Sequence, residues 1–265
     1  MPRNSVATNG TTLSVIDEGS GPAVVLLHGV LMSGRCFENQ LELAANHRIV
    51  IPDIRGHGES EKPLDGHTVP NYARDLHETL ERLGVTRPVL VGWSMGAMVL
   101  YEYLQGFGSD DVAGIVIVDQ VPTDFSWDDG YEFGLFTLQS LLEIVAGLQT
   151  NQRTLSREFA ELMLHEPTEE KIEFLTNEMM LVPPAIASTI VVDQTLRDYR
   201  SFLPKIDVPT LVAFGTDNKL TPPAGEWIAS QIPGAELQYF DAGHALFFER
   251  ASAFNQAIAD FVRAL

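Results

Sequence analysis

Short apolar runs alternate with longer segments of helical periodicity along most of this 265-residue chain. Runs typical of buried strands occupy 12–16, 23–27, 48–51, 88–91, 114–118, 210–214 and 236–240. Apolar positions at helical spacing mark 36–46, 71–83, 95–105, 223–231 and 251–264. Because strands that alternate with helices usually form parallel sheets, the pattern predicts an α/β fold with a doubly wound, mostly parallel sheet.

One long segment interrupts this alternation. Between residues 121 and 204 no run typical of a buried strand occurs, but apolar residues recur at helical spacing in 133–145 and around 159–163. We therefore expect a core domain of residues 1–120 and 205–265 that carries a helical cap, residues 121–204, as an insertion.

Composition and charge narrow the classes of partner. The chain is 45% hydrophobic with a formal net charge of −19, and no cluster of Lys and Arg offsets that charge. Such a protein repels phosphate backbones and anionic headgroups, so we expect a small-molecule substrate and neither nucleic acid nor a membrane as partner. The sequence leaves a homo-oligomer open.

Two absences bear on location and chemistry. The first ten residues lack the apolar region of a signal peptide, and no stretch has the roughly 18 apolar residues of a membrane span, so we expect a cytoplasmic protein. The single cysteine, Cys36, excludes an internal disulfide framework and a cysteine-based metal site. We expect Cys36 to be a small buried side chain, and we expect no metal and no cofactor.

The strongest chemical signal is a G-x-S-x-G motif between an apolar strand and a helix. In this context the motif describes a sharp turn that holds Ser94 in a strained conformation with its hydroxyl exposed at the edge of the sheet. Side chains at Gly92 and Gly96 would collide with the turn. Ser94 is therefore the candidate nucleophile.

A serine hydroxyl needs a base, and the base needs a carboxylate. His244 follows the last predicted strand and precedes the last helix, where it can reach the sheet edge. Asp217, after the strand at 210–214, is the expected carboxylate, and the resulting chain order Ser94, Asp217, His244 is the one associated with this turn. Asp119 follows the strand at 114–118 and is the competitor.

Attack on a carbonyl creates an oxyanion that two N–H donors must stabilise. The backbone N–H of Met95 lies at a helix N-terminus beside Ser94. The tight loop His28-Gly29-Val30 directly follows the buried strand at 23–27, so it offers the N–H of Val30 at the same edge.

These residues resemble the α/β-hydrolase fold superfamily over essentially the whole chain. The resemblance is carried by His28-Gly29, by the turn Asp53-Ile54-Arg55-Gly56-His57-Gly58-Glu59-Ser60, by Gly92-Trp93-Ser94-Met95-Gly96 and by Gly243-His244. It is closest to small esterases and cofactor-free haloperoxidase- or perhydrolase-like enzymes. It implies Ser94 as nucleophile, Asp217 as acid, His244 as base, the amides of Val30 and Met95 as oxyanion hole, a lid over the site, and a structural role for His57.

The resemblance predicts a serine hydrolase that cleaves a carboxylic ester or lactone. Serine at position 94 argues against relatives that use an aspartate nucleophile. A carbon–carbon bond hydrolase, a hydrolase-fold lyase of secondary metabolism, and a ligand receptor with slow or no turnover remain as alternatives, because the fold alone does not select a chemistry.

The predicted cap supplies the expected pocket. Aromatic and aliphatic side chains make that pocket mainly apolar, and the residues expected to line it are Trp93, Leu31, Phe125, Trp127 and Phe136. Between residues 124 and 173 the chain has eleven Asp or Glu and three Lys or Arg. We therefore expect neutral substrates to be preferred over anionic ones, through an effect that salt screens.

Overall fold

The strands of the computed structural model, which describes residues 3–128, 130–220 and 223–265, form one sheet in the order β1-β2-β4-β3-β5-β6-β7-β8. Strands β3 to β8 pair in parallel, whereas β1 and β2 are antiparallel additions at one edge. The predicted doubly wound, mostly parallel sheet is confirmed. The strands are β1 (Asn4–Thr8), β2 (Thr11–Gly19), β3 (Ala23–Leu27), β4 (Arg48–Pro52), β5 (Val89–Trp93), β6 (Gly114–Val118), β7 (Thr210–Gly215) and β8 (Glu236–Phe240).

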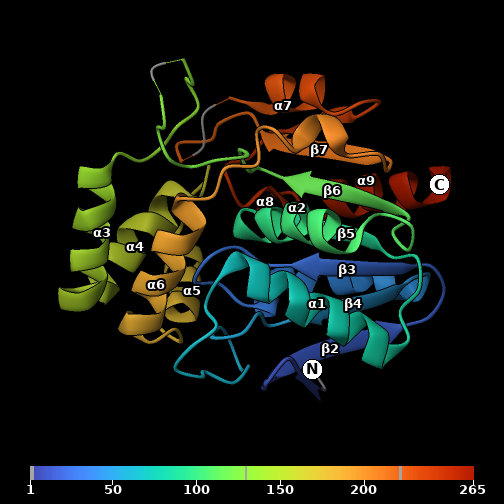
Figure 1. Ribbon diagram of the computed structural model, residues 1–265, viewed down its shortest axis with the longest axis horizontal. Coiled ribbons are helices and arrows are strands. Elements are labelled where there is room, and N and C mark those ends of the chain that lie inside the picture. Colours follow the sequence, from blue (N-terminus) through green and yellow to red (C-terminus); the bar gives the residue numbers. More distant parts are fainter. Residues whose placement is uncertain (1–2, 129, 221–222) are drawn as a thin grey trace.

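Helices cover both faces of this sheet. Helices α1 and α2 pack on each other and cross the face nearer the viewer in Figure 1, whereas η1 packs against α8 and α9. Every residue of β3, β5, β6 and β7 is consequently buried, as expected for parallel strands covered on both sides. These helices are η1 (Gly34–Ala45), α1 (Val69–Leu83), α2 (Met95–Phe107), α7 (Gly225–Gln231), α8 (Leu246–Glu249) and α9 (Ala251–Ala264).

Local capping sets the limits of the helices. Helix α1 begins two residues before the predicted start, because the Thr68 side chain accepts a hydrogen bond from the Asn71 N–H and Pro70 occupies the first turn. It ends at Gly84, whose φ of 61° is the left-handed conformation that stops a helix.

Among the described residues, four α-helices and then a short 3-10 helix, η2 (Leu203–Lys205), lie between β6 and β7. Figure 1 shows the four α-helices together beyond the carboxyl ends of the parallel strands. The first begins at Leu138, later than the periodicity predicts, because Thr137 and Ser140 form a capping box and the aromatic residues before them lie outside the helix. The four are α3 (Leu138–Thr150), α4 (Gln152–Leu162), α5 (Glu169–Met179) and α6 (Pro184–Thr195).

A buried carboxylate ties these helices to the sheet. Glu178 of α5 accepts a hydrogen bond from the Ser33 hydroxyl at 2.5 Å and pairs with Arg35 at 2.6 Å, so α5 is held to the loop that follows β3.

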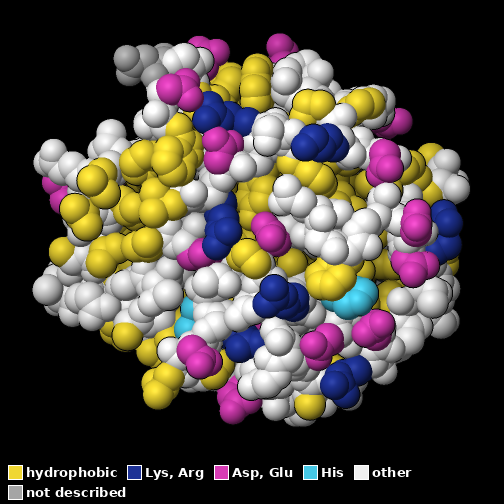
Figure 2. All heavy atoms as spheres, viewed as in Figure 1, with side chains coloured by type: hydrophobic (Ala, Val, Ile, Leu, Met, Phe, Trp, Pro, Cys, Tyr) yellow, Lys and Arg dark blue, Asp and Glu magenta, His cyan; other side chains and the backbone are white. Residues whose placement is uncertain are grey.

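The outer side of α3 exposes apolar side chains. Leu138 and Leu142 are 60% and 58% exposed, and Figure 2 shows hydrophobic side chains gathered over this part of the molecule.

Among the described helices, none alone has the length and apolar character needed to cross a membrane. Helices α5 and α6 meet that test only when taken together, across a 95° bend.

Candidate active site

Ser94 lies at a strained turn between β5 and α2. Its φ of 54° and ψ of −125° are rare for a residue with a side chain. Two hydrogen bonds hold this backbone: the Ser94 N–H donates to the Val118 carbonyl at 3.0 Å, and the Ala97 N–H donates to the Ser94 carbonyl at 2.8 Å. The strain is therefore imposed by β6 and by the first turn of α2.

The glycines of the motif have no room for a side chain. A Cβ on Gly96 would lie 2.3 Å from the Leu27 carbonyl oxygen, and one on Gly92 would lie 2.5 Å from the Ala97 nitrogen. The predicted collision is present, because Gly96 packs against the end of β3 and Gly92 packs against the first turn of α2.

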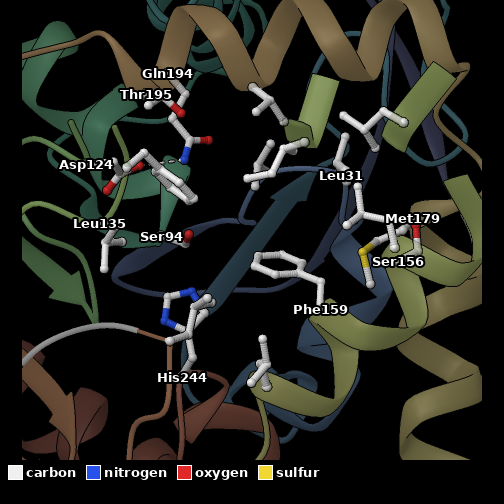
Figure 3. Close-up of a pocket in the computed structure, with 18 of the residues that line it drawn as sticks. Leu31, Ser94, Asp124, Leu135, Ser156, Phe159, Met179, Gln194, Thr195 and His244 are labelled. Atoms are coloured by element: carbon white, nitrogen blue, oxygen red, sulfur yellow. Dashed lines mark hydrogen bonds between the residues drawn. The ribbon is translucent and has the colours of Figure 1, made fainter. Parts of the chain in front are cut away.

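His244 lies in the loop between β8 and α8 and lines the same pocket as Ser94 (Figure 3). The Trp93 indole N–H donates to the His244 carbonyl at 2.9 Å, and the two rings lie 5.5 Å apart. The Ala245 N–H donates to the Met163 carbonyl at 3.2 Å. The imidazole is thus held between the sheet and the loop that joins α4 to α5.

Glu249 reinforces this loop. Its fully buried carboxylate accepts hydrogen bonds from three backbone N–H groups, those of Gly243 at 2.9 Å, His165 at 3.1 Å and Glu166 at 3.0 Å. The loop that carries His244 and the loop between α4 and α5 are therefore joined through one side chain. No motif in the sequence pointed to Glu249.

The structure corrects the carboxylate expected beside His244. His244 Nδ1 donates to Oδ1 of Asp119 at 3.0 Å, and Asp119 is fully buried. Asp217 instead pairs with His165 at the surface, where the Asp217 side chain is 53% exposed. Hydrogen bonding to Asp217 raises the pKa of His165. Asp119, the competitor in the sequence, is therefore the partner of His244.

Strand register explains the correction. Trp93 of β5 pairs with Val118 of β6, so Ser94 and Asp119, which each follow directly, end adjacent strands at the same level. Val118 in turn pairs with Ala213 of β7, so Asp217 lies three residues beyond the level of Asp119. Counting residues from the end of each apolar strand would have favoured Asp119.

Two further donors hold the Asp119 carboxylate. The Gly215 N–H donates to Oδ2 at 2.8 Å, and the Asn218 side-chain amide donates to Oδ1. The loop after β7 thus contributes Asn218 to the site, although the sequence singled out its neighbour Asp217. Three donors thus hold this buried carboxylate in a fixed orientation.

The loop after β3 passes close to Ser94. A Cβ on Gly29 would lie 3.0 Å from Ser94 Cβ. His28 fixes this loop, because its Nδ1 donates to the Gly29 carbonyl at 2.8 Å while its Nε2 accepts from the Ile54 N–H at 2.9 Å. Burial lowers the pKa of His28, so the ring stays neutral. Val30, which follows, is one of the residues that line the pocket.

A cavity of about 250 Å³ opens at Ser94 and His244. Leu31 and Phe136 line it as expected, together with residues of all four inserted helices. Apolar side chains make up most of the wall: Val30, Leu31, Leu135, Phe136, Ile144, Leu148, Leu155, Phe159, Leu162, Met179, Val191 and Leu220.

Three aromatic residues expected in this wall lie elsewhere. Trp93 is buried behind His244 and packs on Phe247, with ring centroids 4.8 Å apart. Phe125 and Trp127 pack on each other at 4.9 Å, and Trp127 is 45% exposed. The strand that carries Trp93 and the loop that carries the other two turn these side chains away from the cavity.

The polar end of the cavity was not predicted. Asp124 is fully buried in the pocket wall, where Oδ1 accepts from the Gln120 amide at 2.6 Å and Oδ2 from the Gln194 amide at 2.8 Å. Burial raises the pKa of Asp124 to about 6. Only the fold brings Gln194 of α6 to Asp124, so neither local pattern nor spacing signals this cluster.

Two other singled-out residues lie outside the cavity. His57 is buried against His28, with centroids 5.0 Å apart, and burial lowers its pKa well below the usual value. Burial likewise raises the pKa of the Cys36 thiol to about 12.

Across the described ranges, no group of three or more His, Cys, Asp or Glu side chains is arranged to hold a metal ion.

Comparisons with known proteins identify the family and the fold. Residues 22–251 match the model of the alpha/beta hydrolase fold family. A putative non-heme chloroperoxidase from Synechocystis sp. is 27% identical over 96% of this chain and 97% of the relative. The structure of an esterase from Exiguobacterium antarcticum superposes with a TM-score of 0.91 at 27% identity, covering 96% of both chains. A bromoperoxidase from Bacillus anthracis, at 23% identity, shares the fold with a TM-score of 0.92 over 99% of this chain and 100% of that one.

Proposed function

The chain belongs to the alpha/beta hydrolase fold family, and from this premise we propose that it is a serine hydrolase that cleaves a carboxylic ester or lactone of a small, mainly apolar substrate. One observation carries the proposal. Ser94 and His244 face one apolar cavity, and the buried carboxylate of Asp119 accepts the Nδ1 proton of His244.

In the proposed reaction Ser94 Oγ attacks the substrate carbonyl while His244 Nε2 removes the hydroxyl proton. Asp119 keeps the proton of the neutral imidazole on Nδ1 and stabilises the imidazolium that forms. The ester C–O bond then breaks, and His244 returns its proton to the leaving alcohol. The acyl group remains on Ser94.

Water completes the cycle. His244 removes a proton from a water molecule, whose oxygen attacks the acyl-enzyme, and the proton then returns to Ser94 as the acid leaves. The carboxylic acid product and the free serine balance the reaction.

The backbone N–H groups of Val30 and Met95 are the proposed oxyanion donors. Neither N–H donates a hydrogen bond to another group within the part of the chain that the structure describes. Both residues are at least nine-tenths buried, and the Met95 N–H lies at the start of α2. Loss of one such donor typically costs about 10²- to 10³-fold in rate.

The substrate class follows from the cavity and from the relatives. The cavity wall is mainly hydrocarbon, and the cavity volume of about 250 Å³ suits a small ligand. The esterase from Exiguobacterium antarcticum supports ester cleavage as the reaction type. We propose an acid or alcohol part of modest size, bound in the space beneath the inserted helices.

The test is hydrolysis of short 4-nitrophenyl esters together with labelling by a fluorophosphonate probe. We expect wild-type protein to turn over at least one ester and to be labelled, whereas Ser94→Ala loses both. Ser156→Ala is the matched control, because Ser156 is another buried serine of the same cavity. Turnover by Ser94→Ala at the wild-type rate would contradict the proposal.

A further inference from the structure

The cavity has one end that holds a buried carboxylate and another end that is mainly apolar. Figure 3 shows Asp124, Gln194 and Thr195 to one side of the Ser94 hydroxyl, and Leu31, Met179 and Ser156 to the other. Apart from the exposed Glu158, Asp124 is the charged group among the described residues that line the cavity. A substrate centred on Ser94 therefore meets two different environments.

Asp124 fixes the orientation of the two amides around it. An ionised carboxylate only accepts hydrogen bonds, so the NH₂ groups of Gln120 and Gln194 must both point toward it. Gln120 uses its second amide hydrogen on the Val121 carbonyl at 2.9 Å. Its amide hydrogens are thus both committed to protein acceptors.

Gln194 has an acceptor left over. Because its NH₂ faces Asp124, its Oε1 points away, and this atom is buried without a hydrogen-bond partner among the described residues. Gln194 is only 6% exposed and lines the cavity. A buried carbonyl oxygen without a donor is unfavourable, so a ligand that brings a donor to this atom gains a hydrogen bond.

We propose that Gln120, Asp124 and Gln194 form a hydrogen-bond-accepting subsite. It binds a neutral hydroxyl or N–H group of the substrate that is distant from the reacting carbonyl. This inference rests on the proposed function and names its substrate class: hydroxylated or amide-bearing esters or lactones. The Gln194 oxygen and the free lone pairs of Asp124 accept the hydrogen bonds. A hydrocarbon, an ether or a ketone leaves Gln194 unpaired, and a carboxylate is repelled by Asp124.

The choice of a neutral donor over an ammonium group follows from the surroundings. Leu135 and Phe136 line the cavity, and their backbone N–H groups donate to the Asp124 carbonyl, so hydrocarbon side chains lie beside the subsite. A cation would lose its hydration there for a single carboxylate that already accepts two hydrogen bonds. The raised pKa of Asp124 reports the same poor solvation.

The experiment measures kcat/KM for matched 4-nitrophenyl esters: butyrate with 3-hydroxybutyrate, and hexanoate with 6-hydroxyhexanoate and 6-aminohexanoate. One neutral hydrogen bond corresponds to about three- to tenfold, so we expect wild-type protein to prefer at least one hydroxy ester by that factor over its deoxy partner. Gln194→Met, which keeps the length but removes the acceptor, is expected to abolish the preference. Gln256→Met is the matched control, because Gln256 lies on the exposed side of α9 and does not line the cavity.

Asp124→Asn provides a second variant, since it no longer forces the Gln194 oxygen outward and should also reduce the preference. A hydroxy-to-deoxy ratio of kcat/KM that is the same in wild type and in both variants would overturn the subsite, as would a preference for the 6-amino ester.

If wild-type protein hydrolyses none of the esters, the proposed function fails. The subsite is then decided by calorimetric titration of the same esters into Ser94→Ala. Tighter hydroxy ester binding that depends on Gln194 supports the subsite, and equal binding overturns it.

Discussion

The carboxyl ends of the parallel strands, called the sheet edge below, and the inserted helices α3–α6 meet at one cavity but are built differently. At the edge, Ser94 and Asp119 each directly follow a buried strand, and both have positive φ. In the insertion, the side chains that face the cavity come from four helices and a long loop. The Asp124–Gln194 contact, for example, joins residues 70 positions apart.

The difference suggests a division of roles. Backbone geometry fixes the groups that we propose to react, because strand register and forbidden Cβ positions leave them little freedom. Side-chain packing fixes the groups that we propose to select the substrate. Changes at the edge should therefore affect the rate for every substrate, whereas changes in the insertion should alter one substrate relative to another.

The largest expected effect is at the strained turn. Ser94→Gly is expected to lower kcat/KM for every ester by at least about 10⁴-fold, since the nucleophile is lost. The same change should raise the free energy of unfolding by about 1 kcal/mol, because glycine adopts the φ of 54° without strain. Urea denaturation measures the second effect, and an unchanged or lowered stability would argue that the turn is not strained.

The second prediction concerns the link between the two regions. Glu249→Gln is expected to lower the free energy of unfolding by about 1–3 kcal/mol and kcat about tenfold, because three backbone N–H groups, two of them partly buried and one exposed, lose a charged acceptor. Asp241→Asn, at an 81% exposed side chain nearby, is the control and should change neither value. Wild-type stability and activity of Glu249→Gln would contradict the prediction that Glu249 links the two regions.

The third prediction is a pH dependence of stability that originates in the insertion. Burial raises the pKa of Asp124 from 3.8 to about 6, so the folded protein holds this proton more tightly than the unfolded chain. Asp124 therefore contributes a loss of stability as pH rises from about 4 to about 6, and the two-unit shift corresponds to roughly 2–3 kcal/mol.

Asp124→Asn should remove that contribution. Urea unfolding of both proteins between pH 3.5 and pH 7.5 is expected to give a difference in stability that grows in favour of the variant and levels off above pH 6. A constant difference over this range would mean that Asp124 titrates normally.

The smallest expected effect is on substrate charge. Many acidic side chains of the insertion lie outside the cavity, and several are paired, as Glu169 is with Arg157 at 2.6 Å and Asp128 with Arg200 at 2.9 Å. Discrimination against anionic esters should therefore arise mainly from buried Asp124, which salt screens poorly. We expect Asp124→Asn to accept a carboxylate-bearing ester about fivefold better, whereas raising the salt concentration should change the wild-type ratio little. If added salt abolishes the wild-type preference for neutral over carboxylate-bearing esters, the acidic side chains on the outer surface cause the discrimination and Asp124 does not.

The sequence predicts the sheet better than the insertion for a physical reason. Strands β3 and β6 agree residue for residue with the predicted runs, because strands covered on both faces are continuous apolar runs. The bounds of β8 also agree, although three of its five residues are exposed. β1 lies outside the predicted runs, since Asn4–Thr8 is mostly polar and three of its five residues are exposed. The start of α3 was placed too early because Phe133 and Phe136 continue a helical spacing outside the helix.

The candidate site divides in the same way. Ser94, His244 and the loop at Val30 follow from local motifs, since each motif describes its own turn. The local pattern does not separate Asp217 from Asp119, because each follows a predicted strand and either one gives the chain order Ser, Asp, His. The distance from the strand end distinguishes them. The partnership of Asp119 with Asn218, and that of Asp124 with Gln194, depend on how elements distant in the chain come together.

The most direct test of the account compares two aspartates with one assay. If the groups at the sheet edge form the reacting unit, Asp119→Asn will lower kcat/KM for a 4-nitrophenyl ester by about 10³- to 10⁴-fold, and Asp217→Asn will leave it within about threefold of wild type. Circular dichroism of both variants controls for folding. The opposite order, with the large loss at Asp217 and little change at Asp119, would contradict the account.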